Sequence, residues 1–334
     1  MKNVHLIYTP FTGVGLHGGF RGNKWLEHRI EVFKNYTLKS MLNQSHTEFL
    51  HWFSFRPEES TNPRVLGLAK HLESINYPFI FTFNGLMYWD DKFNKFSIKV
   101  AMRNMLMMLW DCWKNKELKN PIEILKYTFE RKNKTLLKRV TYSLEAIKRK
   151  IGINYDWVYL TRIDSDDMFH KETVELIQSQ EPAYKRALVF QNGYILNVTT
   201  GQVAEWKPPT NPPFHTIIFP ASVFFSPASY LSYYEDFTTH EDITRIFDCV
   251  VLDMNRYLVS FHKKHHIGTT WETPLIKRVY HRMKFGAPVK GYAYTTSGKN
   301  ISTHWTSHSQ IKNFMIGKEF ESPLKEEILS DFGI

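Results

Sequence analysis

The feature that most constrains the fold is a strand-like run that ends in a cluster of acids. Residues 157–163 are rich in aromatic and branched side chains, and Asp164, Asp166 and Asp167 follow at once. Such a run is typical of a buried β-strand, which here delivers carboxylates at its C-terminal end. Over 169–180 the apolar positions recur at helical spacing, and one of the last two acids is expected to cap that helix.

The acidic turn has the composition of a divalent-cation site. In open α/β sheets, ligands bind just beyond the carboxyl ends of the strands, where this turn would lie. Three carboxylates within four residues repel one another, and Arg162 neutralises only part of their charge. Oxygen ligands suit Mg²⁺ or Mn²⁺, which complete their shells with water and substrate phosphates. The turn therefore predicts a metal–diphosphate site. The alternative is that one acid caps the helix, one pairs with Arg162 and the third is solvated.

Strands and helices alternate through the N-terminal part of the chain. Strand-like segments at 5–9, 48–55 and 79–83 are separated by helical patterns at 24–44 and 65–74. This alternation predicts an α/β fold with a parallel or mixed sheet flanked by helices. Further along we expect a hairpin formed by 187–196 and 202–206, a strand at 216–226, a helix from 239 to about 262, and an amphipathic tail at 322–334.

The net charge of +10 is confined to one segment. Residues 94–150 contain 15 Lys plus Arg against 5 Asp plus Glu, and the rest of the chain holds 28 of each kind. Helical patterns at 98–113 and 122–150 indicate that this segment is a basic helical insertion. It would divide the chain into 1–93, the first part of a nucleotide-binding domain, and 151–334, which would hold the metal site, the acceptor-binding half and the C-terminal tail. It is either a solvated helical surface or a docking face for acidic lipid head groups or DNA and RNA phosphates.

The chain has no segment suited to crossing a bilayer or to directing secretion. No stretch approaches the roughly 20 apolar residues that a transmembrane helix needs. The start of the chain is too short and strand-like for a signal peptide. We therefore expect a cytoplasmic protein, either free or peripheral to the inner face of the membrane.

Two further regions carry candidate functional residues. A glycine-rich loop that includes Gly13 follows the first strand and could admit a phosphate, although its spacing is not the dinucleotide fingerprint. Thr239 and Asp242 have the spacing of a helix capping box, so the acids here can be explained by capping alone. Alternatively, Asp242 or Glu241 lies at the end of a loop, where a general base could act. Among the C-terminal histidines, His304 is the candidate further metal ligand.

Taken together, these segments resemble the rhamnosyltransferase-like family of GT-A glycosyltransferases. The resemblance rests on Trp25-Leu-x-x-Arg29, on Ser40-x-x-x-Gln44 and on Arg162-Ile-Asp-Ser-Asp-Asp167. It is clearest over 1–60 and 155–200. It implies a Rossmann-like GT-A domain that binds a nucleoside-diphosphate sugar through an Asp-x-Asp element and Mn²⁺ or Mg²⁺.

The resemblance also implies roles for individual residues. Asp164 would contact the donor ribose or sugar, and Arg162 would orient Asp164 or a phosphate. Asp166, with Asp167, would bind the metal. Residue 297 is Ser where the family pattern has His. The family pattern therefore does not supply the third metal ligand at this position, for which His304 is the candidate. The loop after the first strand would lie near the nucleotide, through Thr9, Pro10, Phe11 and Gly13.

The function expected is transfer of a sugar from a nucleoside-diphosphate sugar to a hydroxyl acceptor. The acceptor would be a glycan, a lipid-linked glycan or a modified nucleic-acid base. If the reaction inverts configuration, Asp242 or Glu241 would deprotonate the acceptor. Two alternatives remain. A haloacid-type phosphatase would use the first Asp of the turn as nucleophile. A non-catalytic nucleic-acid-binding protein would act through the basic helices alone.

Overall fold

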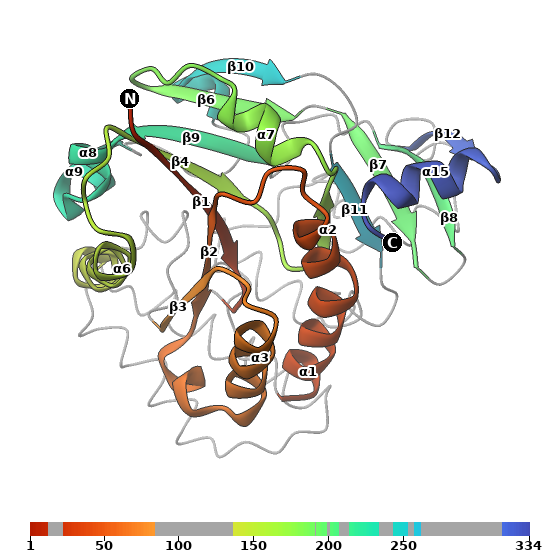
Figure 1. Ribbon diagram of the computed structural model, residues 1–334, viewed down its shortest axis with the longest axis horizontal. Helices are drawn as coiled ribbons and strands as arrows, with labels where there is room; N and C mark the ends of the chain where they lie inside the picture. The colour runs from red at the N-terminus through yellow and green to blue at the C-terminus, as the bar shows by residue number, and fades with distance from the viewer. Residues whose placement is uncertain are drawn as a thin grey trace, which may run out of the picture.

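A mixed sheet of seven strands forms the centre of the molecule (Figure 1). The computed structural model describes residues 1–12, 23–83, 136–190, 192–198, 201–206, 214–233, 243–252, 257–261 and 316–334. The strand order in the large sheet is β10-β6-β9-β4-β1-β2-β3. Only β9 is antiparallel to its neighbours, so the other six strands share one direction. The strands are β1 (Asn3–Pro10), β2 (Leu50–Phe55), β3 (Phe79–Phe83), β4 (Trp157–Arg162), β6 (Arg186–Phe190), β9 (His215–Pro220) and β10 (Asp248–Leu252).

Helices cover both faces of this sheet, as expected for parallel strands joined by crossovers. One face carries α1 (Asn23–Val32), the π-helical turn η1 (Phe33–Thr37), α2 (Leu38–Leu42) and α3 (Pro63–Ser74), with the 3₁₀ turn η2 (Pro57–Thr61) after β2. The other carries α6 (Leu136–Ile151), α8 (Ala221–Phe224) and α9 (Pro227–Tyr233). The expected α/β class, a mixed sheet flanked by helices, is confirmed.

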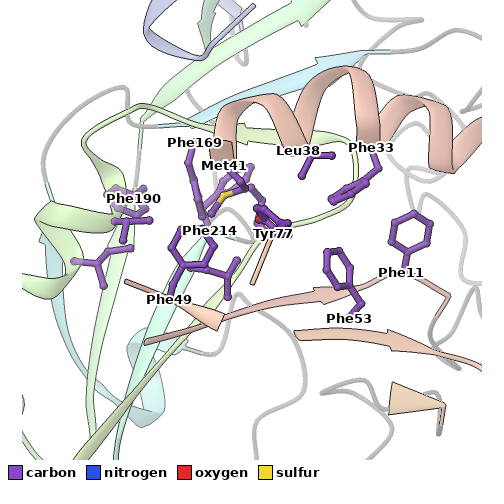
Figure 2. Close-up of a cluster of buried hydrophobic side chains, with 14 of the residues drawn as sticks. Phe11, Phe33, Leu38, Met41, Phe49, Phe53, Tyr77, Phe169, Phe190 and Phe214 are labelled. Carbon is purple, nitrogen blue, oxygen red and sulfur yellow. The ribbon is translucent and has the colours of Figure 1, made fainter. Parts of the chain in front are cut away.

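Side chains of successive strand residues fill two separate cores. On β1, Ile7 belongs to the core beneath α1 and α2, whereas Leu6 and Tyr8 belong to the core beneath α6 and α9. Figure 2 shows part of the first core, where side chains from the α1–α2 helix meet aromatic rings from the strands. Phe33 packs edge-on against Phe53, with 5.3 Å between ring centroids. Each buried ring of this size contributes about 1.5–3 kcal/mol.

A second sheet of five strands, ordered β12-β8-β7-β11-β5, adjoins the first. Its strand β5 follows the acidic turn directly and pairs with β11, opposing Asp167 to Val259. The C-terminal helix α15 covers this sheet, where Ile328 and Phe332 join Met168 in a third core. The strands are β5 (Asp167–Phe169), β7 (Gly193–Asn197), β8 (Gln202–Trp206), β11 (Tyr257–Phe261) and β12 (Ile316–Phe320), and the helix spans Leu324–Asp331.

Several expected elements differ from those observed. The segment 169–180 is helical only over α7 (Thr173–Gln178), and neither Asp166 nor Asp167 caps it, because Asp167 lies in β5. Within the described residues, the expected helix 239–262 is helical only over α10 (Ile243–Ile246), since branched residues after it pair with β6 as β10 and with β7 as β11. Long-range strand pairing overrides local helical pattern here. The expected strand 216–226 ends at Pro220, and α8 follows.

The hairpin prediction is right for its turn and wrong for its first strand. β7 and β8 pair around the turn ending at Gly201, whose φ of 69° suits a residue without a side chain. Residues 187–196 form two strands, because β6 pairs within the seven-stranded sheet and β7 within the five-stranded one. The helical pattern 98–113 and the first part of the second pattern, 122–135, lie outside the described residues, whereas 136–150 are helical in α6. Within the described ranges, no helix combines the length and apolarity that a membrane crossing requires.

Candidate functional site

The strand order reverses between β1 and β4, and this is where the acidic turn lies. From β1 the chain proceeds outward through β2 to β3, and then returns to place β4 on the other side of β1. In open α/β sheets the loops diverge at such a point and leave a crevice outside the carboxyl ends of the two strands. β1 ends at Pro10 and β4 at Arg162. The acidic turn and the start of the glycine-rich loop therefore meet at this crevice.

Hydrogen bonds hold the two strand ends together. The Ile163 amide donates to the Tyr8 carbonyl over 3.0 Å. The Thr9 hydroxyl donates to the Ile163 carbonyl over 2.9 Å and lies 2.8 Å from Nε2 of His51. His51 is fully buried, and its Nδ1 lies 2.7 Å from the Tyr77 hydroxyl. These bonds fix the backbone from which the acids project.

Two guanidinium groups face the three carboxylates. Arg162 donates from Nε and Nη2 to Oδ1 of Asp164, at 3.1 and 3.0 Å, so the predicted orienting role of Arg162 has the required contact. Arg29 of α1 forms an ion pair with Asp166, and both side chains are almost buried. Asp164 is the more accessible partner of Arg162, with 29% of its side chain exposed against 6%. Asp164 is therefore the carboxylate best placed to meet a ligand.

Asp167 lies at the buried end of the turn. Burial raises the pKa of Asp167 well above its usual range, and the charges of Asp166 and Asp164 raise it further. Arg29 and Arg162 oppose this shift without cancelling it. The two arginines therefore pair with Asp166 and Asp164, and Asp167 binds its proton more tightly than an exposed carboxyl group does.

Two polar side chains, Ser40 of α2 and Gln44 just after it, form a clamp that fixes the segment after the turn. The Ser40 hydroxyl accepts from the Phe169 amide at 3.3 Å. Gln44 uses both ends of its side-chain amide, donating to the His170 carbonyl at 3.0 Å and accepting from the Val174 amide at 3.0 Å. The position of the acidic turn therefore depends on the helix α2 as well as on β4.

A second buried ion pair supports the end of β1 from the β2 side. Glu59 of η2 pairs with the guanidinium of Arg56 at 2.6 Å, and their side chains are 2% and 4% exposed. The Thr12 hydroxyl donates to the same carboxylate, and the Arg56 amide donates to it at 3.1 Å. Glu59 therefore joins the residues that follow β1 to those that follow β2.

The predicted site residues divide into three groups. Asp164, Asp166, Asp167 and Arg162 are together in the turn. Thr9 and Phe11 lie beside it, but their side chains are buried, with Phe11 packed on Phe33 and Phe55; Pro10 is half-buried between them. The remaining predicted residues, Gly13, Glu241, Asp242 and His304, lie outside the described residues.

Sequence reasoning gave no role to four residues that shape the site. Arg29, Ser40 and Gln44 belong to the two N-terminal motifs that carried the family resemblance, and the structure shows that each contacts the acidic turn or the strand after it. These two motifs were therefore the sequence signal that could have identified Arg29, Ser40 and Gln44. No sequence signal pointed to Glu59, because a glutamate in a short polar loop is ordinarily solvated.

The acidic turn brings three carboxylates together beside two guanidinium groups. Its carboxylates are close enough to shift one another's proton affinity, and the Arg29 guanidinium already occupies Asp166 as a cation. Among the described residues alone, no three His, Cys, Asp or Glu side chains are arranged as a complete metal-binding group. A cation here would rely on water and phosphate for the rest of its shell, as Mg²⁺ and Mn²⁺ commonly do.

No known family matches the sequence, and no curated protein does. Among solved structures, S. aureus TarS 1–349 aligns at 12% identity over 99% of this chain and 80% of that one, with a TM-score of 0.35. TarS 1–349 in complex with UDP aligns at 11% identity over 100% of this chain and 88% of that one, with a TM-score of 0.33. A nucleotide-diphospho-sugar transferase from Desulfovibrio desulfuricans aligns at 10% identity over 94% of this chain and 99% of that one, with a TM-score of 0.31. Such values describe a distant likeness, from which no activity follows for this chain.

Proposed function

We propose that the chain is a metal-dependent glycosyltransferase, which moves a sugar from a nucleoside-diphosphate sugar to a hydroxyl acceptor. One observation carries the proposal: the acidic turn lies at the point of the sheet where the strand order reverses. Crevices at that point bind nucleotides in other open α/β sheets. An excess of carboxylates there suits a nucleotide that arrives with a divalent cation.

Each described residue has a distinct part in the proposed site. Asp164, held by Arg162 and partly exposed, accepts hydrogen bonds from hydroxyl groups of the donor ribose or sugar. Asp166, with Asp167, holds the cation, and His304 is retained as the further ligand from outside the described residues. The end of β1, with Thr9 and Pro10, and the loop from Phe11 to Gly13 shape the nucleotide pocket through their backbone.

Charge on the leaving group determines the mechanism. Breaking the bond between sugar and diphosphate builds negative charge on the diphosphate, which Arg29 and Arg162 are placed to stabilise. Asp166, with Asp167, would hold a Mn²⁺ or Mg²⁺, which would add positive charge beside the diphosphate. If configuration inverts, the acceptor oxygen bonds to the anomeric carbon as the bond to the diphosphate breaks, and Asp242 or Glu241 is the proposed base that takes the acceptor proton. The acceptor is proposed as a glycan, a lipid-linked glycan or a nucleic-acid base.

The basic segment is proposed to dock an anionic acceptor. Its described part, α6, buries Val140, Leu144 and Ile147 against the sheet and leaves Arg149 and Lys150 exposed. A positively charged outer face of this kind attracts nucleic-acid phosphates or acidic head groups.

A thermal-shift panel tests the proposed function. Nucleoside diphosphates and their sugars are added with and without Mn²⁺, because a ligand of the folded state raises its melting temperature. We expect one nucleotide to raise it only when Mn²⁺ is present. Asp164→Asn and Asp166→Asn should remove that rise, whereas Asp248→Asn should not, since Asp248 lies 71% exposed on the edge strand β10. The absence of any nucleotide response would exclude the proposal.

A further inference from the structure

The ion pair between Arg29 and Asp166 lies where the proposed cation would bind. The Arg29 side chain is 13% exposed and that of Asp166 is 12% exposed, so little water screens the contact. The indole ring of Trp25 lies 5.7 Å from the guanidinium carbon and favours a positive charge at this place. Arg29 thus occupies a carboxylate that the proposed function assigns to a metal.

Arg29 and a divalent ion compete for Asp166, because two positive charges a few ångströms apart repel strongly in a weakly screened site. A divalent ion bound to Asp166 would therefore displace the guanidinium. Arg29 is carried by α1, whose own Leu26 and Ile30 are buried in the core and hold the helix in place, so the displaced side chain would stay beside the turn. A diphosphate bound to the same cation offers oxygens that suit the planar donors of an arginine.

We infer that Arg29 exchanges partners, leaving Asp166 for the donor diphosphate when the cation binds. This inference rests on the proposed function and adds to it a regulation of the same site. Cation alone must compete with Arg29, whereas cation and diphosphate together give Arg29 a new partner. The two ligands therefore bind cooperatively, and the free protein resists loading with metal alone.

The test measures Mn²⁺ binding without any catalytic readout. Protein-bound Mn²⁺ is measured by equilibrium dialysis, without and with inorganic pyrophosphate as the diphosphate probe, because Mn²⁺ already complexed by pyrophosphate in solution is equal on both sides of the membrane. Wild type should bind Mn²⁺ weakly alone and at least about fivefold more tightly with pyrophosphate, the lower end of typical coupling between sites. Arg29→Gln should bind Mn²⁺ alone at least about fivefold more tightly than wild type and show little gain from pyrophosphate.

Two variants control for charge and folding. Arg64→Gln removes the same charge from an exposed pair with Glu27 and should behave as wild type. Arg29→Lys keeps the charge and should retain weak binding of Mn²⁺ alone, which covers the case in which the glutamine variant does not fold. Equal Mn²⁺ affinity of wild type and a folded Arg29→Gln would overturn the exchange alone. No Mn²⁺ binding by any variant, with or without pyrophosphate, would overturn the proposed metal site as well.

Discussion

Gln44 and Val174 are joined by a hydrogen bond of 3.0 Å that links the segment just after α2 to the start of α7, 130 residues further along the chain. The same side chain also donates to the His170 carbonyl. One glutamine therefore satisfies backbone groups on both sides of the turn into α7. Because buried backbone groups are costly to leave without partners, this side chain should fix the segment that follows the acidic turn.

Replacing Gln44 with Ala should loosen that segment. Removing the side chain leaves a buried amide and a carbonyl without partners, at a cost of about 1–3 kcal/mol in the free energy of unfolding. Amide hydrogens of 167–174 should exchange faster than in wild type, as measured by mass spectrometry. Gln180→Ala is the control, because the Gln180 side chain bonds to Leu176 and Ser179, at the end of α7. Unchanged exchange over 167–174 would show that the clamp does not hold the turn.

Replacing Glu59 with Gln should destabilise the protein far more than the same change at Glu27. Glu59 and Arg56 are buried, so breaking their pair leaves an uncompensated charge, at a cost of about 3–5 kcal/mol. Glu27 and Arg64 are 56% and 35% exposed, and solvent screening keeps that pair below about 1 kcal/mol. Urea unfolding of both variants measures the difference. Similar losses would mean that the Arg56 charge finds other compensation.

The buried histidine His51 should contribute to acid unfolding. Burial lowers the pKa of His51 to about 3, whereas an unfolded histidine titrates near 6.5. Between these values the unfolded state binds more protons, so the stability from His51 is complete above pH 6.5 and falls as the pH approaches 3. His51→Gln should be less stable at pH 7 and show a flatter decline below pH 6.5.

Urea unfolding at several pH values tests this expectation. The slope contributed by one such group approaches about 1.4 kcal/mol per pH unit. His46→Gln is the matched control, since the His46 side chain is 43% exposed. A decline equally steep in wild type and His51→Gln would place the acid sensitivity elsewhere.

Reversing charge on the outer face of α6 should separate acceptor docking from donor chemistry. In Arg149→Glu/Lys150→Glu we expect binding to single-stranded nucleic acid to weaken and to depend less steeply on salt, because fewer phosphates are neutralised. Donor hydrolysis should be unchanged, since α6 covers the face of the sheet opposite to α1. Lys39→Glu/Lys70→Glu changes the same charge at exposed positions elsewhere. Equal nucleic-acid binding by the two double variants would remove α6 from acceptor docking.

The N-terminal half of the fold was predictable because its signals are local. The strand 79–83 is observed as β3 with the same bounds, and the helical pattern 24–44 corresponds to α1, η1 and α2. The C-terminal half was less predictable. The residues of β10 and β11 carry a helical pattern, yet they form strands because β6, β7 and β5 offer them partners. Such pairing depends on residues far away in sequence.

The acids of the site were predictable and their partners were not. Asp164 and Asp166 stand out because they directly follow a strand-like run. That Arg29 would meet Asp166 depends on how α1 packs over the sheet, which no local pattern specifies. The expected capping role of Asp166 and Asp167 was wrong for a related reason, since the pairing of β5 with β11 extends the chain where a cap would need it to turn.

The cover that α15 gives to β5 bears on the order in which a nascent chain matures. Met168, next to Asp167, shares a core with Ile328 and Phe332, and Lys171 bonds to Asp331 through both its backbone and its side chain. Strands β1 to β4 can assemble as soon as they leave the ribosome. The far side of the acidic turn, in contrast, cannot bury Met168 in this core until Ile328 and Phe332 have left the ribosome, so a chain that stalls earlier would leave that apolar surface open to water.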